Sequence, residues 1–185
     1  MNLQGMRVGV LIEDGFEDLE LWVVAMRLRE EGASVSLLGP DVGRMFRSKS
    51  GGLAASADLA GPEVESADFE ALVIPGGWAP DRLRRYDWAR NLVRQMDREG
   101  KAIGMICHAG LVGISAGIVA GRRATGSLGI KDDLVNAGAT WVDEAAFREG
   151  NLVWWRIIDD IPDFCRELIL ALVAQKTLAV PTPAE

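Results

Sequence analysis

The sequence predicts an α/β fold, a three-layer sandwich with a mostly parallel sheet and helices on both faces. Short apolar runs rich in β-branched residues alternate along the chain with segments of helical periodicity, the pattern of parallel sheets covered by helices. The composition is ordinary for a globular protein, with 49% hydrophobic and 25% charged residues among 185. There is no internal repeat or interdomain linker, so we expect one domain over residues 1–185.

The first strand–helix–strand unit begins close to the N-terminus. Residues 6–12, MRVGVLI, predict a strand buried on both faces. Residues 17–31 predict a helix, because apolar side chains form one stripe, and Gly32 is a plausible stop. Residues 34–38 predict the next strand, so the connection is a right-handed parallel crossover.

The middle of the chain contains two further strands and an irregular excursion. Glycine and proline punctuate residues 39–62, where we expect a small hairpin around 45–47 and 53–57. Residues 71–74 predict a third buried strand, and residues 101–106 predict the fourth. The connecting and following helices are expected over residues 81–99 and 108–120, the latter in spite of the cost of three glycines.

The last third of the chain predicts shorter elements and a final helix. Asp160 is a candidate cap for that helix and Pro162 a residue of its first turn. The end of the chain, 177–185, is expected to fray. The other expected elements are strands at 122–126 and 140–142, a helix at 130–137, and a hairpin of 146–148 with 152–156.

Charge and motifs exclude several classes of protein. The net charge of −7 argues against nucleic acid, which requires a basic surface. The N-terminus lacks a signal-peptide layout, and the apolar run 111–120 is too short to span a membrane, so we expect a cytoplasmic protein without membrane contact. Two separated cysteines and one histidine form neither a disulfide scaffold nor a usual zinc site, and no P-loop lysine is present. We therefore expect no metal and no cofactor.

Three loops are candidates for a functional site because each directly follows an apolar strand. They are residues 14–17, residues 75–81 and the pair Cys107-His108. In a parallel α/β sheet, sites lie at the carboxyl ends of strands near a point where the strand order reverses. We expect these loops to converge there.

Cys107 is the candidate nucleophile. It stands at the end of a strand and the start of a helix, where a helix N-terminus favours a thiolate and lowers the thiol pKa. The alternative is a buried small hydrophobe, the interpretation that fits Cys165 on the apolar stripe of the last helix. His108, the single histidine, is a candidate base or thiolate partner, although spacing does not show whether its side chain reaches its neighbour.

The other two loops offer an acid and backbone donors. Glu17 is a candidate acid, but it could simply stabilise a helix dipole, as could Asp18 and Glu20, and spacing does not distinguish the three. The turn containing Gly76 and Gly77 is structural first, and it could also supply N–H donors to an oxyanion.

Six stretches of the chain resemble the PfpI branch of the ThiJ/PfpI superfamily, which is related to class I glutamine amidotransferases. The resemblance runs in the family's order over nearly the whole chain. The stretches are EDGFEDLE (13–20), ALVIPGGWAPDRLR (71–84), GMICHAG (104–110), ISAGIVAGRRAT (114–125), GIKDDLVNAGA (129–139) and DDIPDFCREL (159–168).

The resemblance implies a flavodoxin-like sandwich with Cys107 on a strained nucleophile elbow. It implies that a protonated Glu17 contacts the sulfur, and that N–H groups around Gly76 and Gly77 and after Cys107, at His108, form the oxyanion hole. It also implies that Asp81 of a neighbouring subunit orients His108. A homo-oligomer follows, a dimer at least and often a hexamer of three dimers.

The chain departs from the family pattern at several positions. Met105 stands where a small residue is frequent, and Trp78 where a basic residue is usual. Trp154 and Trp155 replace a small polar pair before Arg156. We expect Trp78, the tryptophan pair and Arg156 to line the pocket. The alternative is that the tryptophans cover a subunit interface.

Two kinds of function fit these residues. The first is a cysteine-dependent stress-response enzyme, a hydrolase or lyase that acts on small reactive carbonyls or their adducts, like a glyoxalase or deglycase. Within this class, an intracellular cysteine peptidase is the alternative, and hydration of another small electrophile such as an isonitrile is a lesser one. The second kind is a non-enzymatic stress protein that senses oxidants through Cys107.

Overall fold

The computed structural model describes residues 3–179, and its core is a seven-stranded sheet. The strand order is β10-β11-β7-β6-β1-β2-β5, and all neighbours are parallel except the antiparallel pair β10 and β11. The strands are β1 (Arg7–Leu11), β2 (Ser34–Gly39), β5 (Leu59–Ala60), β6 (Ala71–Ile74), β7 (Ala102–Ile106), β10 (Ala146–Glu149) and β11 (Leu152–Trp155). This is the mostly parallel sheet that the sequence predicts.

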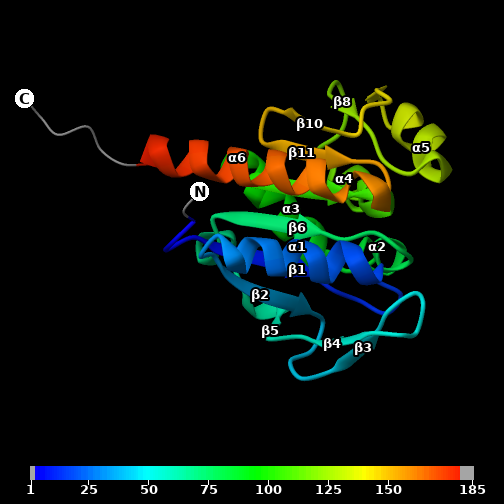
Figure 1. Ribbon diagram of the computed structural model, residues 1–185. Coiled ribbons are helices and arrows are strands. Elements are labelled where there is room, and N and C mark those ends of the chain that lie inside the picture. The colour runs from blue at the N-terminus through cyan, green and yellow to red at the C-terminus, as the bar shows by residue number, and fades with distance from the viewer. Residues whose placement is uncertain (1–2, 180–185) are drawn as a thin grey trace, which may run out of the picture.

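Helices cover both faces of the sheet, so the three-layer sandwich is confirmed (Figure 1). α1 (Asp18–Glu30) and α6 (Ile161–Ala179) pack together on one face. On the other face, α4 (Gly110–Ala116) contacts both α2 (Ala79–Leu83) and α3 (Asp87–Arg98). α5 (Lys131–Asn136) packs beside α4 at the end of the molecule that also carries β8.

Small elements complete the fold. β3 (Met45–Arg47) and β4 (Ala54–Ser56) form the expected hairpin, and β8 (Arg123–Ala124) pairs in parallel with β9 (Thr140–Trp141). Five short 3-10 helices lie in the connections: η1 (Gly61–Glu63), η2 (Ser66–Asp68), η3 (Cys107–Ala109), η4 (Leu128–Ile130) and η5 (Ile158–Asp160).

The strand order places three connections side by side. The chain moves from β1 outward to β2 and β5, then returns to β6 on the other side of β1 and continues to β7. The turns after β1, β6 and β7 therefore meet at the carboxyl edge of the sheet, where the direction of winding reverses.

The helix expected over residues 81–99 is two helices in the structure. Tyr86 has an extended conformation (φ −82°, ψ 128°) and separates α2 from α3. Its hydroxyl donates a hydrogen bond of 2.9 Å to the buried carboxylate of Glu13. This long-range bond stabilises a break that helical periodicity does not reveal.

Two other helix boundaries differ from expectation. The helix expected over residues 108–120 begins as η3 and ends at Ala116, because Gly117 adopts a left-handed conformation (φ 76°). α6 continues to Ala179, so residues 177–179 are helical rather than frayed, and residues 180–185 lie outside the described part of the chain.

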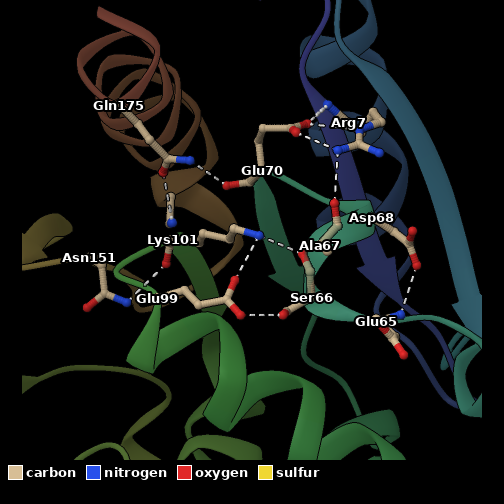
Figure 2. Close-up of polar contacts among 11 residues, drawn as sticks. Arg7, Glu65, Ser66, Ala67, Asp68, Glu70, Glu99, Lys101, Asn151 and Gln175 are labelled. Carbon is tan, nitrogen blue, oxygen red and sulfur yellow. Dashed lines mark hydrogen bonds and ion pairs between the residues drawn. The ribbon is translucent and has the colours of Figure 1, made fainter. Parts of the chain in front are cut away.

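A polar network joins the opposite, amino-terminal edge of the sheet to α6 (Figure 2). The Glu70 carboxylate pairs with Arg7, at 2.7 Å from Nη2. Gln175 of α6 donates to the Glu70 carbonyl at 2.7 Å and accepts from the Ala102 N–H at 3.1 Å. The amide therefore satisfies backbone groups of two neighbouring strands.

Over residues 3–179, every helix is too short or too polar to cross a membrane. The same residues contain no group of three histidine, cysteine or acidic side chains placed to hold a metal ion.

Candidate active site

Cys107 occupies a strained turn between β7 and the helices that follow. Its φ is +55°, the only positive value for a residue other than glycine in the described part of the chain. Such a conformation costs about 1–3 kcal/mol and persists only where the surrounding structure imposes it. The preceding residue, Ile106, is extended, so the chain turns from strand to helix at the cysteine. This is the geometry of a nucleophile elbow.

His108 lies directly against the thiol. Its Nδ1 is 3.2 Å from the Cys107 Sγ, so adjacent side chains do reach each other here. Burial lowers the pKa of His108, and the charge of Lys49 lowers it further. The imidazole is therefore mainly neutral at pH 7 and can accept the thiol proton.

Glu20, rather than Glu17, is the acid beside the thiol. Glu17 caps α1, and its Oε2 accepts the N–H groups of Leu19 and Glu20 at 2.9 Å each. The Glu20 carboxyl is fully buried, and its Oε2 accepts the Gly76 N–H at 2.7 Å. The thiol and this carboxyl influence each other's pKa.

Burial raises the pKa of Glu20 to about 8, although the Gly76 N–H opposes the shift. The carboxyl is therefore mostly protonated at neutral pH. A signal for this residue does exist in the sequence, because Glu20 lies four residues before Val24 and eight before Leu28, on the buried stripe of α1. An acid on an apolar stripe is unusual and points to a special environment.

The thiol pKa is raised, contrary to the lowering expected from a helix N-terminus. Burial raises the pKa of Cys107 to about 12, and the charge of an ionised Glu20 adds to the shift. The His108 backbone N–H and the Ser127 hydroxyl oppose it. The free protein therefore holds a thiol, and a base has to remove its proton during any nucleophilic attack.

Ser127 also lies beside Cys107, although no motif in the sequence predicts it. Its N–H donates to the Cys107 carbonyl at 3.0 Å, while its hydroxyl accepts the Gly129 N–H at 3.3 Å. A Cβ at Gly126 would lie 2.6 Å from the same carbonyl oxygen, so only glycine fits there. No local pattern links residues 126–129 to Cys107, because their contact is made by the tertiary fold.

The structure separates the roles of the two glycines after β6. We expected the Gly76 N–H to bind an oxyanion, but it donates its hydrogen bond to Glu20 and is not available for that role. Gly77 (φ 76°) lines the cavity at Cys107, and its N–H has no acceptor among the described residues. A Cβ there would lie 2.3 Å from the Gly15 carbonyl oxygen, so the turn requires glycine.

A cavity of about 220 Å³ opens above the thiol. Besides the residues already placed there, Lys49 and three consecutive residues of the β11–α6 connection line it. Lys49 comes from the glycine-rich segment after β3, where the sequence gives no sign of a functional role. The lining residues are Glu17, Glu20, Lys49, Gly77, Cys107, His108, Ile157, Ile158 and Asp159.

Asp81 does not bond to His108 within the chain. It forms an ion pair with Arg85 on α2. Asp81 and His108 nevertheless line one hollow of about 480 Å³, which adjoins the cavity at Gly77.

The tryptophan pair does not line the cavity. Trp154 and Trp155 are 0% exposed and belong to the core, where Trp155 stacks on Phe164. They therefore neither line the cavity nor cover a subunit interface, because β11 is an inner strand with helices on its faces. Met105 is also a core residue and does not line the cavity.

The other two expected pocket residues lie beside the cavity rather than in it. Trp78 is 61% exposed and lines the hollow shared by Asp81 and His108. Arg156 pairs with Asp160 at 2.9 Å and with Asp143 at 2.6 Å, and it lines a separate hollow.

Comparison with known proteins agrees with this architecture. A model of the DJ-1/PfpI family matches residues 6–171. The chain belongs to the DJ-1/PfpI family. A deglycase of Pyrococcus abyssi is 42% identical over 167 residues, which are 90% of this chain and 99% of the relative. General stress protein 18 of Bacillus subtilis is 35% identical over 91% of this chain and 98% of its own.

A solved structure extends the likeness to three dimensions. The crystal structure of a two-domain protein of Anabaena variabilis, with DJ-1/ThiJ/PfpI-like and ferritin-like domains, superposes with a TM-score of 0.89 at 33% identity. The match covers 96% of this chain and 50% of that one. This DJ-1/PfpI chain therefore has the flavodoxin-like sandwich that the resemblance implies.

Proposed function

We propose that this protein is a cysteine-dependent stress-response enzyme that acts on small reactive carbonyls or their adducts, as a glyoxalase or deglycase does. One observation carries the proposal. The strained Cys107 thiol lies between a neutral imidazole and a protonated buried carboxyl, facing a small cavity. The names of relatives, deglycase and general stress protein, support the same class.

The geometry supports a first step of nucleophilic addition. His108 Nδ1 takes the thiol proton as the Sγ forms a bond to the carbonyl carbon. The electron pair of the C=O double bond moves to oxygen, and we assign stabilisation of the negative charge to the N–H of Gly77, which lines the cavity. Protonated Glu20 then neutralises the alkoxide, and its own carboxylate is held by the Gly76 N–H.

The cavity favours small substrates over polypeptide. About 220 Å³ is less than the volume of an ordinary drug-sized ligand site. A cysteine peptidase would need an extended groove for several residues of its substrate. We therefore rank peptidase activity below carbonyl chemistry.

The raised pKa of the Cys107 thiol disfavours the redox-sensing alternative. Oxidation by peroxide proceeds through the thiolate, and burial raises the pKa of Cys107 to about 12. Mass spectrometry after mild peroxide treatment would favour this alternative only if Cys107 oxidised far more readily than Cys165.

We also propose that the working form is a homo-oligomer, a dimer at least. His108 has no acid partner in its own chain over the described residues, and the hollow beside it contains Asp81. Asp81 of a second subunit would orient the imidazole. Two free cysteines suit a reducing compartment, and we place the protein in the cytoplasm.

A cysteine comparison tests the proposed reaction. Cys107→Ser should lower turnover of methylglyoxal or its adducts by roughly 1000-fold or more, because hydroxyl is a far weaker nucleophile here. Cys165→Ser is the matched control and should retain activity, since Cys165 lies on the buried stripe of α6. Equal turnover by wild type and Cys107→Ser would contradict the proposal.

A further inference from the structure

The connection between β11 and α6 places one free acid at the rim of the cavity. Asp160 is held by Arg156, but its neighbour Asp159 is exposed and has no ion pair or hydrogen bond among the described residues. Of two consecutive aspartates, the first faces the cavity and the second anchors the loop. Asp159 is therefore free to meet a ligand.

The charges around the cavity are unbalanced. Near neutral pH, Glu20 and His108 are mainly uncharged, because burial shifts both pKa values toward the neutral form. The remaining charged lining residues are Glu17 and Asp159 against Lys49. The cavity thus carries a net negative charge, which attracts cations and repels anions.

Two further features of the cavity bear on the ligand that it can hold. Ile157 and Ile158 are 46% and 39% exposed and form an apolar wall beside Asp159. Glu20 also lines the cavity, and Oε1 of its fully buried side chain has no hydrogen-bond partner among the described residues. The cavity lining thus combines an exposed carboxylate, an apolar wall beside it and a buried acid next to the thiol.

We propose that Asp159 selects substrates that carry a positive charge, namely carbonyl adducts of amine or guanidinium side chains, over neutral adducts of thiols. The inference rests on the proposed function and names its substrate class. In such an adduct the modified carbon is bonded directly to the charged nitrogen, so the charge enters the cavity together with the carbon that Cys107 attacks, and there it meets the carboxylate of Asp159. The aliphatic stem of the lysine or arginine leaves the cavity along Ile157 and Ile158, as such stems lie on apolar surfaces.

A kinetic comparison tests this specificity. The substrates are methylglyoxal adducts of N-acetyl-arginine amide, which is cationic, and of N-acetyl-cysteine amide, which is neutral. Asp159→Asn should lower the ratio of kcat/KM for the arginine adduct to that for the cysteine adduct by about threefold to tenfold, as expected for one partly screened charge. Glu63→Gln, which removes an exposed charge from η1, should leave the ratio unaltered. An unaltered ratio in Asp159→Asn overturns the proposal.

A labelling experiment tests the charge preference without turnover. In a Cys165→Ser background, Cys107 is labelled with a cationic aminoethyl and an anionic sulfonatoethyl methanethiosulfonate. The cationic reagent should react faster, and Asp159→Asn should reduce the rate ratio by about threefold to tenfold. About 1 M salt should reduce it as well, because the Debye length falls to about 3 Å.

The two experiments separate the two hypotheses. Equal labelling ratios in the parent and Asp159→Asn proteins overturn the role of Asp159. A reduced ratio combined with no turnover of either adduct by wild type supports the cation preference of the cavity and overturns the proposed function.

Discussion

Three acids at the start of α1 have three different tasks. Glu17 caps the helix, and Glu20 is buried against Cys107. Asp18 accepts a 2.7 Å hydrogen bond from the Ser50 hydroxyl, which connects α1 to the segment after β3. Burial alone would raise the pKa of Asp18, but hydrogen bonds from the Ser48 and Ser50 side chains lower it. Position on the helix, rather than residue type, decides which acid can stay protonated.

Glu20→Gln tests this assignment through stability. Burial raises the pKa of Glu20 from 4.5 to about 8, so the folded protein binds this proton more tightly than the unfolded chain. The stabilisation is complete below pH 4.5 and is lost as the pH rises to about 8. Denaturant titrations across this window should show the free energy of unfolding of wild type falling relative to that of Glu20→Gln.

The control for this experiment is an acid outside the site. The difference in free energy of unfolding between wild type and Glu63→Gln should not change with pH in this way, because Glu63 is exposed on η1. Parallel pH curves for wild type and Glu20→Gln would show that Glu20 does not titrate near pH 8.

At the scale of elements, long-range side-chain bonds decide where helices break and dock. Tyr86 fixes the boundary of α2 and α3 through Glu13, which in turn lies in the turn after β1. Gln175 docks α6 on the ends of β6 and β7 (Figure 2). Both contacts join residues more than seventy positions apart, and neither produces a local pattern.

Gln175→Ala should destabilise the fold by about 1–3 kcal/mol, because it leaves the buried Ala102 N–H and the Glu70 carbonyl without their partner. Chemical denaturation gives the value directly. Thr177→Ala, two residues later on α6, removes only an exposed hydroxyl bond to the Val173 carbonyl and should cost much less. Equal losses of unfolding free energy in the two variants would mean that the Gln175 hydrogen bonds contribute little to stability.

At the scale of the whole molecule, the strand order assembles the site. β1, β6 and β7 are neighbours in the sheet, so α1, the Gly76-Gly77 turn and the cysteine elbow meet at one edge. The neighbouring hollow at Asp81 and His108 is where we expect a second subunit.

Subunit mixing tests that expectation. Asp81→Asn and Cys107→Ser proteins should each be strongly impaired as separate homo-oligomers. If Asp81 acts across the interface, mixed oligomers regain one intact site, formed by Cys107 of one chain and Asp81 of the other. Activity should therefore rise after dissociation and reassembly of a mixture. Purely additive activity would place Asp81 outside the reaction of the neighbouring subunit.

The sequence by itself determined the sandwich, the strands and the position of Cys107 at the end of a strand. Apolar β-branched runs report burial on both faces, and Cys107 directly follows one of them, so these features depend on local pattern. The sequence also indicated that acids and glycines follow the strands expected at residues 6–12 and 71–74.

Only the tertiary structure decided which of these residues reach the thiol. It selected Glu20 over Glu17, added Ser127 and Lys49, and assigned the Gly76 N–H to a carboxyl. It also moved Trp154 and Trp155 from the expected pocket into the core. The reason is physical, because burial and hydrogen bonding depend on which segments meet in space, and residues that meet at the edge of a sheet can be far apart along the chain.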